Sequence, residues 1–299
     1  SLRYLDREFR IMSAWKKLAG AAAGEIVWSA DLANGTSNAD NVSVNSLIGE
    51  YSTTGMFFGA NGAKLFINYT TGTVYECDLS TNYDLSTISY NSVSFSYSSQ
   101  STENAGLCFN ADGTKMFIMS RRPPDRVLEF DLSTAWDLST ASYSQAFSVM
   151  SQDNDPEDVV FSLDGTKMLV LGKYSTSYSY TLSTGYDVST ASYDSVSFNF
   201  GFQTNNPTFM FLNFDGDKLY MCGYGGTGSR VWEYDLSTPN DFSTISYNSV
   251  NLDVYAATGG NTNPQGGSQS PQAIAFSADG TTMVVNGGTH GNLISFDLS

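Results

Sequence analysis

Short apolar runs alternate along this chain with stretches rich in Gly, Asn, Asp, Ser and Thr. Residues 106–109 and 116–118, for example, are apolar and flank an Asp-Gly pair at 112–113. A glycine in that place can adopt a positive φ, so the chain can double back as a hairpin. Residues 231–234 (Val-Trp-Glu-Tyr) follow the two-residue period of a half-buried strand. The pattern predicts short antiparallel strands joined by tight turns.

The hairpin motif at 109–115 (Phe-Asn-Ala-Asp-Gly-Thr-Lys) has counterparts at 58–64, 161–167, 212–218 and 276–282. Its turn glycines at 62, 113, 165 and 216 are 51, 52 and 51 residues apart, and the last gap, to Gly280, is 64 residues. Each repeat has room for four strands, here lettered a to d in chain order. Four antiparallel strands per repeat are typical of a β-propeller blade. The sequence therefore predicts an all-β, five-bladed β-propeller.

The two ends of the repeat region predict how the ring closes. The last repeat stops after strand c at Ser299, and residues 40–44 resemble the strand d sequence at 91–95. We expect this N-terminal strand to complete the last blade and so to remove the open sheet edges. Residues 27–32 also resemble a strand c, which leaves six blades as an alternative.

The motif Asp-Leu-Ser-Thr-Ala-Trp-Asp-Leu-Ser-Thr at 131–140 recurs between strands c and d. Its paired carboxylates, Asp131 and Asp137, raise the possibility of a calcium site. An Asp placed two residues before Ser or Thr can also accept backbone N–H bonds in an Asx-turn, and Thr181 replaces the first Asp in the third copy. Because Thr is a poor calcium ligand, we interpret these aspartates as structural. The aromatic residues of the same loops are expected to pack between blades.

The amino-acid composition argues against several classes of function. Acidic residues outnumber basic ones by 30 to 14, and the formal net charge is −16. Nucleic-acid binding needs clustered Lys and Arg, so this balance argues against it. No run approaches the roughly 18 apolar residues of a membrane-spanning helix. The cysteines, Cys77, Cys108 and Cys222, lie inside apolar runs without the spacing of a zinc site, and we expect buried thiols.

The connections between strands differ in how much they vary. The a–b and c–d connections share one face of a propeller and are nearly uniform here, whereas the b–c and d–a loops on the other face differ from blade to blade. Unrepeated loops are where binding is expected. The candidate ligand- or partner-binding residues in them are Arg121, Arg122, Asp153, Asp155, Asn205, Asn206, Tyr224 and His290.

These loops carry little catalytic chemistry. The paired arginines suit a carboxylate ligand, and the acidic turn at 153–158 lacks the spacing of a helical calcium loop. No Gly-x-Ser-x-Gly elbow, Cys–His pair or phosphate-binding loop is recognisable. We therefore assign no catalytic residue, no metal site and no cofactor.

Residues 1–24 form a segment separate from the propeller at 25–299. An apolar stripe spaced by three and four residues predicts an amphipathic helix, formed by Leu2, Leu5, Phe9, Met12 and Trp15. Residues 1–19 hold five bases and two acids, which leaves −19 on the rest of the chain. Such a stripe needs a covering surface, either its own propeller or a partner. We expect it to anchor the protein to an assembly.

The motifs at 112–116 (Asp-Gly-Thr-Lys-Met) and 74–81 (Val-Tyr-Glu-Cys-Asp-Leu-Ser-Thr) resemble those of WD-repeat and YVTN-type β-propellers. The 131–140 motif is similar to repeats found in bacteriophage and environmental bacterial proteins, including virion and tail-fibre-like proteins. This resemblance implies a non-enzymatic virion protein: an appendage, decoration or tail component that binds host surfaces or other virion proteins. The alternatives are a propeller-type glycoside hydrolase or lyase and a secreted or cell-surface glycan-binding protein.

Overall fold

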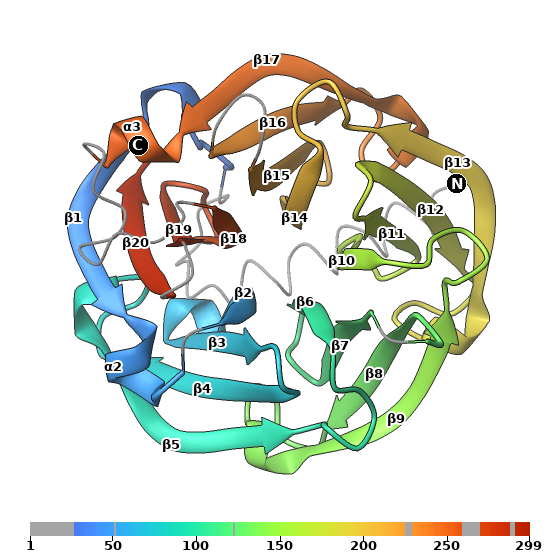
Figure 1. Cartoon of the computed structure of the whole chain (residues 1–299), viewed down its shortest axis with the longest axis horizontal. Coiled ribbons are helices and arrows are strands. Elements are labelled where there is room, and N and C mark those ends of the chain that lie inside the picture. Colours follow the sequence, from blue (N-terminus) through green and yellow to red (C-terminus); the bar gives the residue numbers. More distant parts are fainter. Residues whose placement is uncertain (1–26, 51, 122, 225–228, 259–269, 288–290) are drawn as a thin grey trace.

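The computed structural model describes residues 27–50, 52–121, 123–224, 229–258, 270–287 and 291–299. In these residues, five four-stranded antiparallel sheets are arranged in a ring around a central axis (Figure 1). The protein is a five-bladed β-propeller, as the repeats predict. The expected N-terminal helix, with its stripe of Leu2, Leu5, Phe9, Met12 and Trp15, lies outside the described residues.

In the first four blades the strands run outward from the axis in chain order. The first blade contains β2 (Thr53–Gly59), β3 (Lys64–Tyr69), β4 (Thr73–Leu79) and β5 (Ile88–Ser96). The second contains β6 (Asn104–Phe109), β7 (Lys115–Ser120), β8 (Arg126–Leu132) and β9 (Ala141–Ser148). The third contains β10 (Pro156–Phe161), β11 (Lys167–Gly172), β12 (Thr176–Leu182) and β13 (Ala191–Asn199). The fourth contains β14 (Asn206–Leu212), β15 (Lys218–Tyr224), β16 (Arg230–Leu236) and β17 (Ile245–Asp253).

The fifth blade is built from both ends of the described chain. It contains β18 (Pro271–Phe276), β19 (Thr282–Gly287), β20 (Asn292–Asp297) and, as its outer strand, β1 (Thr36–Ser43). Val42 lies opposite Leu293 and Thr36 opposite Asp297 in an antiparallel ladder. The predicted N-terminal closure is thus confirmed, except that Val44 begins the short helix α2 (Val44–Ile48) instead of continuing the strand.

The alternative of six blades is wrong. Residues 27–31 form no strand, and the 3₁₀ turn η1 (Leu32–Asn34) follows them. The Trp28 ring covers Gly280, where a Cβ atom would lie 2.8 Å from the indole. The Asp31 N–H donates to the Leu298 carbonyl at 2.9 Å. The segment is therefore the c–d connection of the fifth blade. It resembled strand c because Asp-Leu occurs both at the end of strand c, as at 131–132, and in the following c–d loop, as at 137–138.

Equivalent 3₁₀ turns stand between strands c and d in the other blades: η3 (Leu85–Thr87), η4 (Leu138–Thr140), η5 (Val188–Thr190) and η6 (Phe242–Thr244). In the second blade the Asp137 carboxylate accepts the Ser139 N–H at 3.0 Å. Asp84, Asp187 and Asp241 form the same bond in their own blades. The structural interpretation of this second aspartate is confirmed.

The first aspartate of the motif has a different structural role from the expected turn. Asp131 lies on β8 and pairs with the Lys115 ammonium, with Nζ and Oδ1 2.7 Å apart. In the third blade Thr181 takes this place and accepts a bond from Lys167 at 2.7 Å. These residues join strands b and c inside one blade.

The aromatic residues of the c–d loops pack between blades, as predicted. Trp136 stacks on Phe57 of the first blade, with ring centroids 6.2 Å apart, and also contacts Phe109 of its own blade. A Cβ atom on the turn residue Gly113 would lie 2.2 Å from the indole. Glycine is therefore favoured at this turn for two reasons: its φ is positive, at 73°, and the indole ring leaves no room for a Cβ atom.

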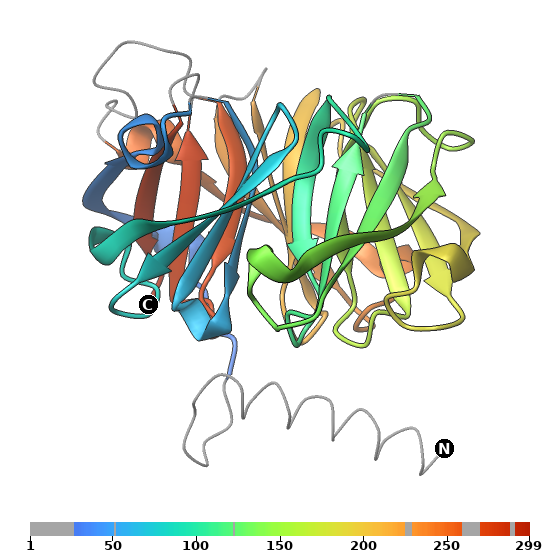
Figure 2. The same cartoon turned by 90° about the horizontal axis from the view of Figure 1, so that it is seen from below.

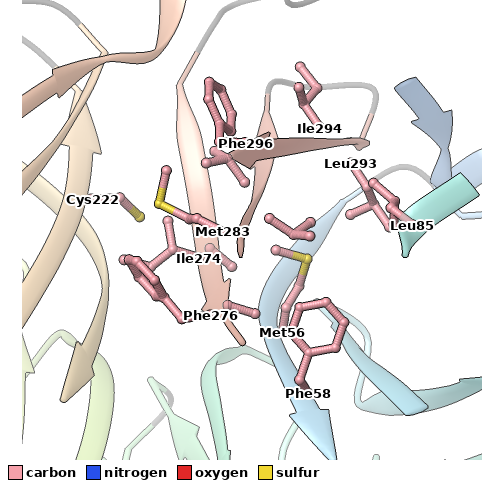
Figure 3. Packing of buried hydrophobic residues seen from close by; sticks show 14 of the residues in the cluster. Met56, Phe58, Leu85, Cys222, Ile274, Phe276, Met283, Leu293, Ile294 and Phe296 are labelled. Carbon is pink, nitrogen blue, oxygen red and sulfur yellow. The ribbon is translucent and has the colours of Figure 1, made fainter. Parts of the chain in front are cut away.

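The buried hydrophobic residues form four clusters among the described residues, and each cluster spans neighbouring blades. Figure 3 shows Ile274 and Phe276 of the fifth blade beside Met56 of the first blade and Cys222 of the fourth. Close packing of this kind makes core positions sensitive to changes in volume. The three cysteines are buried as predicted, and burial raises the pKa of Cys77 and of Cys222 to about 12.

The ring has two faces, which Figure 2 shows edge-on. The lower face carries the a–b turns, including η2 (Ala60–Gly62), and the c–d turns. The upper face carries the b–c and d–a loops together with α2 and α3 (Val254–Ala257). Among the described residues no helix has the length and apolar character to cross a membrane.

Candidate functional site on the upper face

The described candidate residues all lie in upper-face loops or at the strand ends beside them. They are Arg121, Asp153, Asp155, Asn205, Asn206 and Tyr224. The structure brings the first three together where the second and third blades meet, and the last three together between the third and fourth blades. Arg122 and His290 lie outside the described residues.

Two ion pairs form a charged junction between the second and third blades, which we define as Arg121, Asp155, Glu157 and Lys173. The Arg121 guanidinium pairs with the Glu157 carboxylate across the blade boundary. The Lys173 ammonium pairs with Asp155, with Nζ and Oδ2 2.6 Å apart. Both cations are therefore engaged by carboxylates of their own chain, so the junction first of all joins two blades.

A bulge in β10 positions Glu157. Pro156 pairs with Gly172 and Asp158 with Leu171, so the strand ladder skips the residue between them. A bulge of this kind redirects one side chain. Glu157 is only 4% exposed, and its burial raises the pKa to about 7, although the Arg121 charge opposes the shift. This carboxyl group titrates near neutral pH.

Three further carboxyl groups lie around the junction. Asp158 is fully buried, and its Oδ2 accepts the Met210 N–H of the fourth blade at 2.7 Å. Asp153 accepts the Asp155 N–H at 2.8 Å in an Asx-turn. Burial also raises the pKa of Asp125, Asp153 and Asp158. Among the described residues no group of His, Cys, Asp and Glu has the arrangement of a metal site.

The buried carboxyls predict how stability depends on pH. Because the pKa of Glu157 is higher in the folded protein, protonation favours the folded state, and this contribution is lost as pH rises from about 4.5 through 7. The titration of Glu157 should lower the free energy of unfolding of the wild type by up to about 3 kcal/mol over this range. We expect Glu157→Gln to abolish that part of the decrease. The measurement is the free energy of unfolding from pH 5 to 8 in urea.

Asp187 supplies a control of opposite sign for this prediction. The Ser189 hydroxyl bond lowers the pKa of Asp187, so its contribution is present above the unfolded-state pKa and is lost as pH falls below it. Asp187→Asn should therefore lower the free energy of unfolding by a constant amount between pH 5 and 8, and should change its pH dependence only at acid pH. A pH profile for Glu157→Gln that parallels the wild type between pH 5 and 8 would contradict the assignment of Glu157.

Exposed apolar side chains gather on the upper face. Among the described residues, seven large hydrophobic side chains are strongly exposed, and five of them belong to upper-face loops or strand ends: Met150, Tyr174, Phe202, Tyr224 and Tyr255. Phe202 is 93% exposed and Tyr174 73%. Scattered single apolar residues are ordinary on a surface, whereas these five share one face of the ring, in the loops and strand ends of blades two to four.

Two hydrogen bonds, one between backbone groups and one from a side chain, connect the loops that carry three of these residues. We define Tyr174, Phe202 and Tyr224 as the aromatic ridge. The Ser175 carbonyl accepts the Phe200 N–H at 2.6 Å, which ties the first loop to the second. The Thr204 hydroxyl donates to the Tyr224 carbonyl at 2.7 Å, which ties the second loop to the third. The three loops that carry the ridge are therefore connected to one another by hydrogen bonds.

The candidate residues chosen from the sequence included only Tyr224 of this ridge. Phe202 continues the alternation of Phe198 and Phe200, and it was not among the residues chosen from the sequence. The structure ends β13 at Asn199, and Phe202 follows in the loop. The neighbouring Gly201 interrupts the strand pattern, and it could have indicated that Phe202 lies in a loop.

No known protein family matches the sequence, and no curated protein matches it. The fold is similar to that of glutaminyl cyclase from Myxococcus xanthus, with a TM-score of 0.57, 10% identity and coverage of 89% of this chain and 97% of that one. This likeness shows the propeller fold alone.

Two further solved structures are similar at lower scores. One is the β-propeller domain of Cps50 (Swd1) from Myceliophteria thermophila, with a TM-score of 0.46, 7% identity and coverage of 83% of this chain and 84% of that one. The other is a candidate 6-phosphogluconolactonase from Bacteroides uniformis, with a TM-score of 0.47, 15% identity and coverage of 76% of this chain. The chain spans 61% of the length of the Bacteroides protein.

Proposed function

We propose that the protein is a non-enzymatic binding propeller that attaches to surface glycans through the aromatic ridge. The observation that carries the proposal is the ridge itself: exposed rings on hydrogen-bonded loops, confined to one face of the ring. Aromatic rings stack on the apolar faces of sugars, and the neighbouring Asn205 and Asn206 offer amide groups to hydroxyls. Tyr and Asn on a rigid scaffold also serve other loop-based binding surfaces.

The test is a glycan array probed with the full chain, followed by calorimetry with the strongest ligand. We expect the double variant Tyr174→Ala with Phe202→Ala to lose about 100-fold or more in affinity, because truncating two anchor residues costs at least about 1.4 kcal/mol each. Tyr143→Ala is the matched control, since Tyr143 is a 44% exposed tyrosine on the outer strand β9. Equal affinities for the double variant and wild type would refute the ridge as the binding surface.

We also propose, from the similarity of the repeats to phage repeats, that the protein belongs to a virion as an appendage, decoration or tail component. A propeller offering one binding face suits host recognition. Mass spectrometry of purified particles tests this placement directly. Absence of the protein from particles, together with glycan binding by the isolated chain, would favour a secreted or cell-surface binding protein.

A glycoside hydrolase or lyase is the second candidate function. The observation in its favour is Glu157, whose pKa of about 7 suits a general acid. Against it, the same carboxylate is nearly inaccessible and pairs with Arg121. A substrate screen with wild type and Glu157→Gln separates the two functions, because glycan binding without turnover supports the binding propeller, whereas turnover lost in Glu157→Gln supports the enzyme.

A further inference from the structure

The inner strands leave an apolar opening where the central axis meets the lower face. The cavity measures about 70 Å³, and inner strands of all five blades line it. Half-buried side chains surround its mouth, and we define them as the lower funnel: Phe57, Ala111, Phe161, Leu163, Phe211 and Phe214. This surface lies on the opposite face from the aromatic ridge and has no part in the proposed function.

Acidic residues surround the lower funnel. The a–b turns of four blades each carry an acid, namely Asp112, Asp164, Asp215 and Asp279. Burial opposes ionisation of Asp279, but bonds from Ser277 and Thr281 lower its pKa, so it stays charged. The lysines that follow three of these turns bond to acidic side chains of their own blades. The funnel thus presents an apolar centre within a negatively charged rim.

The chain enters the described structure next to this funnel. The Trp28 ring contacts Phe211 and Phe276, both of which line the cavity, at centroid distances of 5.8 and 5.5 Å. Residues 1–19 are separated from Trp28 by a short linker that can span about 30 Å when extended. Tethering of this kind gives an effective concentration on the order of mM.

We propose that the lower funnel is the docking site for residues 1–19 of the same chain. The stripe of Leu2, Leu5, Phe9, Met12 and Trp15 supplies the apolar face, and its five flanking bases match the acidic rim. A helix of this length is marginally stable alone, so covering its apolar face on the propeller also stabilises it. The cavity is smaller than the roughly 150 Å³ that accommodates benzene, so an aliphatic side chain of the stripe fits it best.

Zero-length carbodiimide cross-linking of the full chain tests this docking. The reagent joins an amine to a carboxylate only where they touch. We expect cross-links from Lys16 or Lys17 to Asp112, Asp164 or Asp215, identified by mass spectrometry in the monomer fraction from size-exclusion chromatography. Cross-links found only in a dimer fraction would assign the funnel to a second copy, and their absence from all fractions would leave the stripe for a partner subunit. Either result overturns the proposal.

Matched variants separate docking by the apolar stripe from a loose attraction between charges. Phe9→Asp should lower the cross-link yield by about tenfold or more, because it removes at least about 1.4 kcal/mol of apolar burial. Ala14→Asp changes the charge equally on the opposite side of the predicted helix and should leave the yield near that of wild type. Equal yields in the two variants would refute docking through the stripe.

A second pair of variants tests the funnel side. Ala111→Asp places a charge in the funnel, and Ala135→Asp places one on an exposed loop of the same blade and face. We expect only the first to reduce the yield. Circular dichroism and thermal unfolding establish that each variant folds, and if Ala111→Asp does not, the pair Phe9→Asp and Ala14→Asp decides the question alone.

Discussion

Deleting residues 40–47 should open the ring and destabilise the protein by about 5 kcal/mol or more. The deletion removes the half of β1 that pairs with Leu293 and Ile294 of β20. It also removes Val44, which is fully buried and whose N–H donates to the Gly291 carbonyl at 2.9 Å. Burial of one such side chain contributes about 1.5 to 3 kcal/mol, and the exposed edge of β20 adds a site for aggregation.

Urea unfolding of the deletion variant measures this effect. The control deletes residues 1–12, which are not among the described residues, whereas the five four-stranded sheets are built entirely from described ones. We expect that control to keep most of the stability of the full chain, because no described blade depends on those residues. Similar losses in the two variants would show that β1 is not what closes the ring.

The fold could be predicted because its signals are local and repeated. A turn glycine such as Gly113 requires only its own hairpin, and Asp137 caps a turn two residues away. Each signal occurs in several blades, so the fold can still be predicted when one copy is ambiguous. Residues 27–32 were misread as a strand c because they precede the first repeat and could not be compared with other copies of it.

The upper-face site was less predictable because its contacts join residues from different blades. Arg121 and Glu157 are 36 residues apart, and only the ring places their loops together. The sequence pattern suggested that Arg121 was available to a ligand, whereas its guanidinium is paired within the chain. Exposure of Phe202 depends on where β13 ends, and residue pattern defines strand ends poorly.

A buried glutamate on strand c links each of the first two blades to the next one. The Glu129 side chain is 1% exposed, pairs with Lys115 and accepts the Val188 N–H of the third blade at 3.0 Å. Glu76 accepts the Leu138 N–H of the second blade in the same way, at 3.0 Å. Burial lowers the pKa of Lys115, but the bonds that its ammonium donates to Asp131 and Glu129 outweigh burial and leave that pKa raised, so Lys115 stays charged at neutral pH.

The third blade places its carboxylate differently. Ser179 replaces the glutamate, and the carboxylate comes from Asp194 on strand d, which accepts bonds from Ser179 at 2.7 Å and Thr181 at 2.6 Å. The described bonds of Asp194 stay within its own blade. Comparing the two carboxylates therefore separates the link between blades from the ion pair within a blade.

Glu129→Ala should cost about 3 to 5 kcal/mol, because it leaves the Val188 N–H without its acceptor and deprives Lys115 of one of its two carboxylates. Glu129→Gln keeps an oxygen for that N–H and should cost less than half as much. Asp194→Ala breaks no bond between blades and should also fall below Glu129→Ala. Urea unfolding of the three variants gives the order, and a loss for Asp194→Ala equal to that for Glu129→Ala would mean that the bond to Val188 adds nothing to the stability of the ring.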